Sequence, residues 1–235
     1  IEVDKGQHLQ KLVIDDAISP SHYLGALGSS GITAWVGINR VLPIEANKVM
    51  SISSAAGIVA NIAGQLAMRK NAKVIGIAGG KTKCKQVVED IGFDACVDHQ
   101  RADLESRLAD TAQQFGGIDL HYENVGAKTL DPVLNAMNEL GHIALCGLIA
   151  HYQDTSPITL KHFRKLLTAG ITLQPFRVYD HPQDFIPAQQ ELMAGLKEGW
   201  LTVKETITDG IENAPEAYIN MLNGGGTGKH LIRIT

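Results

Sequence analysis

The sequence predicts an α/β fold in which helices cover both faces of a doubly wound, mostly parallel sheet. Short apolar runs without polar alternation recur along the chain, as expected for strands that are buried on both faces. A segment with helical spacing follows most of these runs. This alternation implies right-handed crossovers between parallel strands.

The expected elements follow one another in a regular order. Residues 11–14 form a candidate strand, and residues 21–41 are helical in two pieces split at 29–31. The alternating part predicts strand 49–53, helix 58–70, strand 74–78, helix 81–90, strand 95–98, helix 102–115, strand 118–123, helix 128–140, strand 142–146, helix 160–169 and strand 171–178. The last part predicts helix 185–198, strand 202–208, helix 214–223 and strand 230–234.

The overall composition excludes several classes of protein. The chain has 235 residues, of which 44% are hydrophobic and 20% charged, with a net charge of −4. This balance argues against a nucleic-acid partner. No apolar run approaches the roughly 20 residues that cross a bilayer, and no signal-peptide pattern opens the chain. We therefore expect a cytoplasmic protein without a membrane partner.

The cysteines and histidines give no metal pattern. Cys84, Cys96 and Cys146 form no CxxC pair and no disulfide framework, which agrees with a reducing cytoplasm. The nine histidines lack zinc-ligand spacing, so we expect no metal. Cys84 and Cys146 are candidate nucleophiles, but without a matching His and Asn the role of a small buried hydrophobe is favoured.

A small-residue turn follows the strand at 49–53 and opens the helix at 58. In a dinucleotide-binding domain the amides at such a helix start face the pyrophosphate. Of the usual glycine series only Gly57 remains, with Ser54 and Ala60 at the outer positions. The residues alone therefore leave a plain strand-to-helix turn as an alternative.

The end of the next strand favours NADP(H) over NAD(H). An NAD site places a carboxylate about 20 residues past the glycine turn, for the ribose 2′-OH. Here Lys81 and Lys83 stand instead, and an ammonium suits a 2′-phosphate. Lysine in a first helical turn opposes the helix dipole, so an anion partner explains it better than a solvated helix start.

Two glycine-lysine segments raise a phosphate-loop NTPase as a further alternative. Residues 76–82 follow a strand, but the spacing to Gly80-Lys81 is one residue short of the Walker A pattern. Residues 224–230 have His230 where Ser or Thr would bind Mg²⁺, and they lead into a strand.

With these landmarks placed, an ordered series of motifs resembles the medium-chain dehydrogenase/reductase superfamily, and within it the zinc-independent alkenal/enone reductases. The motifs are Tyr23-Leu-Gly-Ala-Leu-Gly28 with Gly31-Ile-Thr-Ala34, Ala55-Ala-Gly57-Ile-Val59, Gly76-Ile-Ala-Gly-Gly80, Gly92-Phe-Asp-Ala95, Glu123-Asn-Val-Gly126 and Cys146-Gly-Leu-Ile149 with Tyr152. The resemblance implies a Rossmann-like domain over 21–180 and a segment over 181–235 that completes the catalytic domain. Residues 1–20 would be the remnant of a GroES-like catalytic barrel. Because the chain begins at Ile1, we expect a preceding portion to be missing.

The resemblance also assigns cofactor contacts. Gly57, Ile58, Val59 and Ala60 would face the pyrophosphate, and Lys83 and His99 the 2′-phosphate. Asn124 would lie beside the ribose. The nicotinamide would be lined by Cys146, Gly147, Leu148, Ile149 and Tyr152, and by Phe176, Arg177 and Val178 on the strand that also forms the family's dimer edge.

Several residues depart from the family pattern. Side chains at Ser54 and Ala60 would crowd the turn, because the family has glycine at both positions. Gly226-Thr-Gly-Lys229 replaces a segment that begins with asparagine, and Glu123 replaces an aspartate.

The implied activity is NADPH-dependent reduction of the C=C bond of α,β-unsaturated aldehydes or ketones by a homodimeric enzyme, with hydride transfer to the β-carbon. Tyr152 is the candidate catalytic residue. A truncated, non-catalytic NADP-binding or scaffold module is the alternative.

Overall fold

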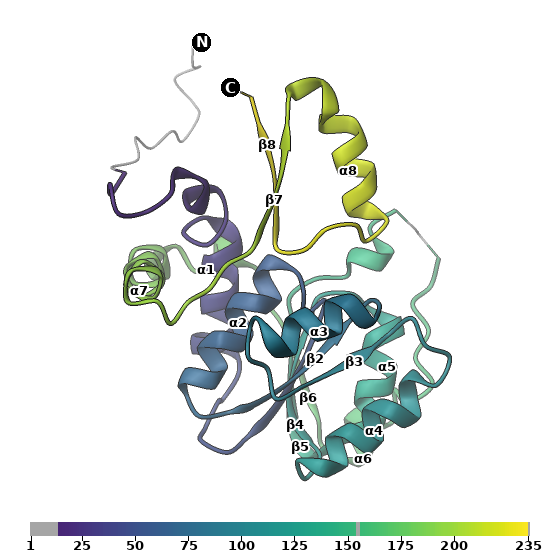
Figure 1. Cartoon of the computed structure of the whole chain (residues 1–235). Helices are drawn as coiled ribbons and strands as arrows, with labels where there is room; N and C mark the ends of the chain where they lie inside the picture. Colours follow the sequence, from purple (N-terminus) through teal and green to yellow (C-terminus); the bar gives the residue numbers. More distant parts are fainter. Residues whose placement is uncertain (1–13, 154–155, 235) are drawn as a thin grey trace.

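The computed structural model describes residues 14–153 and 156–234. Its centre is a parallel sheet of six strands in the order β3-β2-β1-β4-β5-β6 (Figure 1). The strands are β1 (Val49–Ser53), β2 (Lys73–Ala78), β3 (Ala95–Asp98), β4 (Ile118–Glu123), β5 (Met137–Leu145) and β6 (Thr172–Pro175). This order is that of a doubly wound sheet, so the predicted α/β fold is confirmed.

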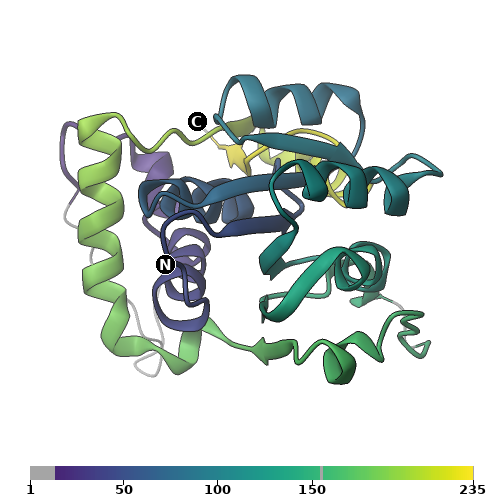
Figure 2. The ribbon, with the colours of Figure 1, turned by 90° about the horizontal axis from the view of Figure 1, so that it is seen from below.

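Helices bury both faces of the sheet, as seen end-on in Figure 2. They are α1 (Ser29–Val36), α2 (Ile58–Arg69), α3 (Lys81–Glu89), α4 (Leu104–Gln114), α5 (Ala127–Ala136), α6 (Lys165–Thr168), α7 (Phe185–Glu198) and α8 (Ala214–Leu222). Met50 and Ile52 of β1 pack with α1, α2 and α7, whereas Val49 packs with α4 and α5 on the other face. Each fully buried aliphatic side chain contributes about 1.5–3 kcal/mol, which explains why apolar residues predominate in these strands.

A small second sheet joins the last part of the chain. Its strands β7 (Glu205–Asp209) and β8 (Lys229–Arg233) pair in parallel and are connected through α8. The Gln65 side chain on α2 holds the preceding linker, because its amide bonds both the N–H and the C=O of Thr202, each at 2.8 Å. This clamp fixes the second sheet relative to α2.

Several predicted boundaries are wrong. The helix expected at 128–140 ends at Ala136, and Met137 begins β5. An apolar residue at position 137 fits the spacing of a helix and that of a strand. The apolar spacing therefore did not mark the point where α5 ends and β5 begins. The helix expected at 160–169 is reduced to α6, and the break expected at 29–31 lies earlier, since Ser29 already begins α1. In the candidate strand at 11–14, residues 11–13 lie outside the described residues.

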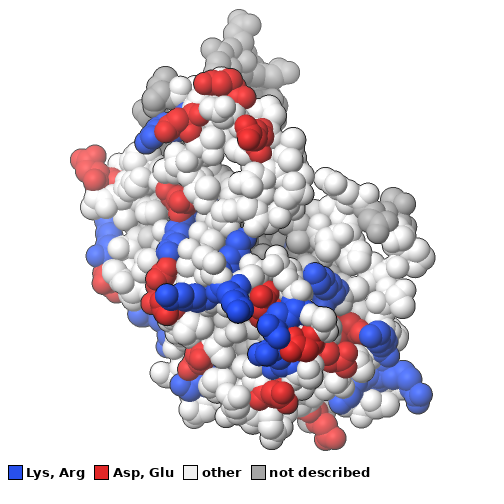
Figure 3. All heavy atoms as spheres, turned by 45° about the vertical axis from the view of Figure 1, so that its right-hand side comes forward, with Lys and Arg blue, Asp and Glu red and all other residues white. Residues whose placement is uncertain are grey.

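The structure gives two further facts on the expected partners. Among the described residues, no helix is long and apolar enough to cross a membrane. Basic and acidic side chains are interspersed on the face shown in Figure 3. The proposed domain limits at residues 20 and 180 stay a prediction; α7 belongs to the same apolar core as α1 and α2.

Candidate cofactor-binding site

The predicted site residues lie in the segments that follow the strands, in loops or in the first turns of α2 and α3. Carboxyl ends of parallel strands share an edge, and open α/β sheets bind ligands where the strand order reverses. In this sheet the reversal lies between β1 and β4, which pair from Met50–Leu120 to Ile52–Tyr122. The candidate site is therefore the carboxyl edge around β1 and β4.

The turn from β1 into α2 keeps the backbone of a phosphate-binding turn. Ser54 has φ 55°, in the left-handed region that favours glycine, and its carbonyl accepts the Gly57 N–H at 2.8 Å. The first amides of α2 have no carbonyl within the helix to bond. Ala60 is 1% exposed and packs in the core, so its methyl group does not narrow the turn.

The loop before β8 packs directly on this turn. The Gly228 N–H donates to the Ala56 carbonyl at 2.8 Å, and Gly57 and Gly228 form a parallel bridge. Gly228 has φ 70°, and a Cβ there would lie 1.9 Å from the Lys204 carbonyl oxygen. Only glycine lets the backbone approach this closely.

A basic cluster (Lys83, His99, Lys128 and His230) lies at the β2 and β3 side of the site. Burial lowers the pKa of Lys83. Burial lowers the pKa of His99, and the charges of Lys128 and Lys83 lower it further. Burial and then Lys83 lower the pKa of His230. Within the described ranges, no carboxylate forms an ion pair with these four side chains, but the charge of the neighbouring Asp98 acts on His99 and raises its pKa in part. The two lysines make the cluster a positive site.

Two observations define the centre of the basic cluster. The Lys83 Nζ donates to the Gly224 carbonyl at 2.7 Å, which places it over the loop that covers the phosphate turn. The His99 Nδ1 is buried without a hydrogen-bond partner in the described part of the chain. Leaving a buried polar atom unpaired costs about 1–3 kcal/mol. Ammonium groups without an ion-pair partner, beside an imidazole nitrogen without a hydrogen-bond partner, fit a bound anion.

Asn124 follows β4 and is fixed to the end of β1. Its Nδ2 donates to the Ser53 carbonyl at 2.9 Å, and its backbone N–H donates to the Ser53 Oγ at 2.7 Å. The side chain therefore lies at the point where the strand order reverses; its contact with the cofactor ribose stays a prediction.

A buried polar network (Ser51, Ser53, His121, Glu123 and Thr129) supports this position. Glu123 accepts hydrogen bonds from Ser53 Oγ at 2.7 Å, from Thr129 Oγ1 at 3.0 Å and from His121 Nε2 at 2.8 Å. Burial alone would raise the pKa of Glu123, but the hydrogen bond and charge of His121 and two backbone amides outweigh it and lower the pKa. Glu123 thus stays ionised and holds the loop.

The loop after β5 folds over the loop after β4. The N–H groups of Cys146 and Gly147 donate to the Glu123 carbonyl, and the Ala127 N–H at the start of α5 donates to His151 Nε2 at 3.2 Å. The Cys146 thiol hydrogen-bonds the Tyr122 hydroxyl, and burial raises the pKa of Cys146 to about 11. A thiol in this state is a poor nucleophile, which leaves the packing role.

Tyr152 and Ile149 form the open rim of the site. The Tyr152 side chain is 70% exposed and Ile149 is 54% exposed. The Tyr152 hydroxyl accepts the Leu148 N–H at 3.5 Å and lies over Gly147, where a Cβ would approach it to 3.1 Å. A catalytic role for Tyr152 stays a prediction.

The segment after β6 presents its backbone rather than its side chains. Phe176 is buried and meets the Tyr122 ring edge-on at 6.0 Å between centroids, and Val178 is also buried. The exposed Arg177 guanidinium pairs with Asp180 through two bonds of 2.8 Å. These three side chains are therefore not brought together around one point.

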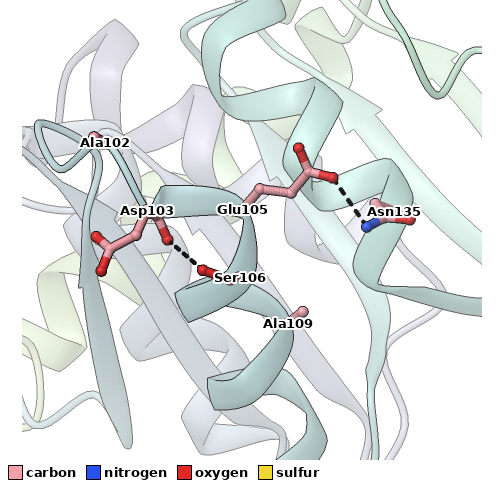
Figure 4. Close-up of a pocket in the computed structure, with 6 residues that line it drawn as sticks. All are labelled: Ala102, Asp103, Glu105, Ser106, Ala109 and Asn135. Atoms are coloured by element: carbon pink, nitrogen blue, oxygen red, sulfur yellow. Dashed lines mark hydrogen bonds between the residues drawn. The ribbon is translucent and has the colours of Figure 1, made fainter.

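A separate cavity of about 410 Å³ lies between α4 and α5 (Figure 4). Its polar groups are already paired: Ser106 Oγ donates to the Asp103 carbonyl, and Asn135 Nδ2 donates to Glu105. No predicted site residue lines it, so it is not part of the candidate site.

The other predicted chemistries find no site. Gly76 lies inside β2, where a Cβ would approach Val87 to 2.8 Å, so residues 76–82 form no phosphate-cradling loop. Residues 224–230 lead into β8, a strand. In the part of the chain that the structure describes, no group of three or more His, Cys, Asp or Glu side chains is arranged to hold a metal ion.

Sequence reasoning missed the buried network, Lys128, His151 and His230. Polar residues at alternate positions, Ser51 with Ser53 and His121 with Glu123, mark the network, because alternate residues share one face of a strand. Ser51 and His121 are direct neighbours in the β1–β4 pairing. No comparable pattern marks Lys128, His151 or His230, which come together only in the fold.

The fold and the site define a dinucleotide-binding domain of the doubly wound class. The pattern of the zinc-binding dehydrogenase family matches residues 59–194. The chain belongs to this family and, within it, to the zinc-independent branch of the medium-chain dehydrogenases/reductases.

Individual relatives agree with this assignment. The chain is similar to the NADPH-dependent curcumin reductase of Escherichia coli (35% identity over 99% of this chain and 68% of that protein). It is also similar to the (+)-pulegone reductase of Mentha piperita (30% identity over 94% of this chain and 64% of that protein). The solved structure of CurA with NADPH from Vibrio vulnificus superimposes with a TM-score of 0.86 at 34% identity, over 92% of this chain and 65% of that one. The chain thus spans about two thirds of the length of these relatives.

Proposed function

We propose that this chain is the NADPH-binding part of an oxidoreductase that reduces the C=C bond of α,β-unsaturated ketones or aldehydes. The basic cluster carries the cofactor assignment. It lies one strand beyond the phosphate turn, where the 2′-phosphate of NADPH would extend from the adenosine ribose, and no carboxylate of the described residues forms an ion pair with its lysines. The names of the relatives support the enone as substrate class.

The residues of the chain fit this cofactor. Lys83 and His99 would hold the 2′-phosphate, since both carry N–H donors and the His99 Nδ1 lacks a partner. The amides of Ile58 and Val59 would face the pyrophosphate. Asn124, held by Ser53, would position the ribose. When bound, the cofactor supplies a hydride for the β-carbon of the substrate.

The rim residues would act on the substrate. Ile149 and the Tyr152 ring offer an exposed apolar surface that excludes water from the reacting carbons. The Tyr152 hydroxyl is a hydrogen-bond donor at the same rim, suited to stabilise the charge that develops on the carbonyl oxygen. We expect Tyr152→Phe to lower kcat with little change in NADPH affinity.

Two measurements test the proposal. Thermal shifts with NADPH, NADH and ATP–Mg²⁺ should show the largest stabilisation with NADPH. An assay that follows NADPH absorbance with an enone should show consumption that a saturated ketone does not support. NADPH binding without turnover of any enone would favour the non-catalytic module, and stabilisation by ATP–Mg²⁺ alone would contradict the cofactor assignment.

A further inference from the structure

Two cysteines meet at the edge of the sheet, and neither is among the predicted cofactor contacts, although Cys84 directly follows Lys83. Cys84 lies in the first turn of α3 and Cys96 in the neighbouring edge strand β3 (Figure 1). Their thiols hydrogen-bond to each other. The Cys84 thiol also faces the Ala78 carbonyl at 4.0 Å. The pair is therefore within reach of a single covalent step.

Both thiols open into one cavity of about 250 Å³. The rim of this cavity carries Lys81, Arg101 and Arg107 against a single lining carboxylate, Asp98. Asp98 is itself occupied by the N–H groups of Gly80 and Gln100, at 2.7 and 2.9 Å. The two arginines share Asp103 outside the cavity. The rim thus favours the approach of an anionic reagent.

The two thiols are not equivalent. The hydrogen bond from Cys96 lowers the pKa of Cys84, whereas the same contact and burial raise the pKa of Cys96. Cys84 is therefore the thiol that ionises first, and the thiolate is the nucleophile in thiol–disulfide exchange.

We propose that Cys84 and Cys96 form a redox-active pair that an anionic low-molecular-weight disulfide, such as oxidised glutathione, converts to an internal disulfide. The Cys84 thiolate attacks one sulfur of the reagent, its S–S bond breaks, and one thiol leaves. Cys96 then loses its proton and attacks the Cys84 sulfur, which releases the second thiol. Two electrons pass from the cysteines to the reagent, which is reduced to two thiols.

The local structure allows the bond to close. The sulfur atoms must approach from hydrogen-bonding distance to about 2 Å. The helix α3 has nine residues, and Val87 is its one buried residue. Its first turn is thus held by few apolar contacts and can shift toward β3. This inference does not depend on the proposed function, since neither thiol belongs to the predicted cofactor contacts.

The test treats the reduced, folded chain with oxidised glutathione, blocks free thiols with an alkylating reagent and maps the peptides by mass spectrometry. After cleavage at lysine and arginine, we expect a disulfide between the peptide 86–101, which contains Cys96, and the peptide that carries Cys84. Cys146 should be found alkylated. In Cys96→Ser we expect a stable glutathione adduct on Cys84. In Cys84→Ser, reaction at Cys96 should be at least about tenfold slower, because the activated thiol is gone.

Matched controls separate chemistry from folding. Cys146→Ser should leave the cross-link unchanged, and thermal unfolding of each reduced variant should show a native transition. A neutral disulfide should react at least about tenfold more slowly than oxidised glutathione. In Arg101→Gln the ratio of these two reaction rates should be smaller than in the wild type. A glutathione adduct that persists on wild-type Cys84, or equal reaction at Cys146, would overturn the proposal. So would free thiols at both Cys84 and Cys96 after treatment.

Discussion

At the scale of single residues, the site depends on charges that are left without partners and on one charge that has many. His99 lies among like charges with an unpaired Nδ1, whereas Glu123 accepts hydrogen bonds from side chains and from backbone amides. The surroundings of His99 are unfavourable in the free protein, and a bound anion would improve them. The hydrogen bonds of Glu123 fix the loop after β4. The two residues therefore respond in opposite ways to pH.

His99 should take up a proton when the cofactor binds. Its pKa is lowered in the free protein, by burial first and then by Lys128, so the imidazole is neutral near pH 7. A 2′-phosphate raises this pKa, so affinity gains as the pH falls through the His99 pKa of the complex and levels off only below the lowered pKa of the free protein. Because the phosphate itself titrates near pH 6, the comparison is with His99→Gln. Calorimetry should show the ratio of wild-type to variant affinity rising as the pH falls; a constant ratio would contradict the assignment.

Glu123 should stabilise the fold as an anion. Glu123→Gln puts an amide donor among groups that donate hydrogen bonds, and it breaks the buried pair of Glu123 with His121. Breaking a buried ion pair costs about 3–5 kcal/mol of stability. Because the folded pKa of Glu123 is lowered, its stabilisation is present above the unfolded pKa of about 4.3 and is lost as the pH falls through the folded value. Urea unfolding of Glu123→Gln should show a lower free energy of unfolding than the wild type. This free energy should also fall less steeply as the pH is lowered. The exposed Glu139→Gln is the control, with a change within about 0.5 kcal/mol; an equal, small effect at both positions would be inconsistent with the network.

At the scale of elements, the strands and the doubly wound class of the sheet could be predicted from the sequence, but the contacts that shape the site could not. Short, largely apolar runs marked β1 and β2, because a strand buried on both faces carries few polar residues, and the apolar residues Ile118, Leu120 and Tyr122 marked β4. The end of α5 was missed because Met137 satisfies the spacing of a helix and of a strand alike. The clamp of Gln65 on Thr202 links residues 137 positions apart and leaves no local pattern.

The site was predicted in part for the same reason. Gly57, Lys83 and Asn124 each follow a strand, so topology alone brings them to one edge. His230 and Lys128 reach the basic cluster from β8 and α5, elements whose approach depends on tertiary packing. Arg177 was expected at the nicotinamide, but the sequence could not show that Asp180 pairs with it.

The loop before β8 offers a test at this scale. Gly224 and Gly228 both have positive φ, so an alanine costs about 1–2 kcal/mol of backbone strain at either position. At Gly228 the new Cβ would collide with the backbone of Lys204. At Gly224 the new Cβ would have no other atom within 4 Å. We expect Gly228→Ala to lower the thermal midpoint more than Gly224→Ala and to weaken NADPH binding by detaching the loop from the turn. Equal effects of the two variants would argue against this contact.

At the scale of the whole molecule, the sheet ends in an open edge. The strand β6 is the last in the order and pairs on one side with β5. An unpaired edge is a template for another strand. We therefore keep, as a proposal, the homodimer that the family resemblance implies, joined at this edge.

Sedimentation should show whether this edge joins two copies. We expect the wild type to sediment as a dimer and Leu173→Pro as a monomer, because proline removes a backbone donor from the strand. Circular dichroism of the variant checks that the fold is kept. A wild type that stays monomeric at all concentrations, or a variant that stays dimeric, would contradict the edge-to-edge arrangement.

The central claim is that the basic cluster binds the 2′-phosphate of NADPH, and the ratio of NADPH to NADH affinity tests it most directly. Calorimetry should show a clear preference for NADPH in the wild type. Lys83→Ala should reduce this ratio about tenfold or more, since a charge-assisted hydrogen bond contributes about 1.5–3 kcal/mol, with NADH affinity unchanged. Lys85→Ala, on the same helix but paired with Glu89, should keep the wild-type ratio. An unchanged ratio in Lys83→Ala, or equal affinity of the wild type for both nucleotides, would contradict the account.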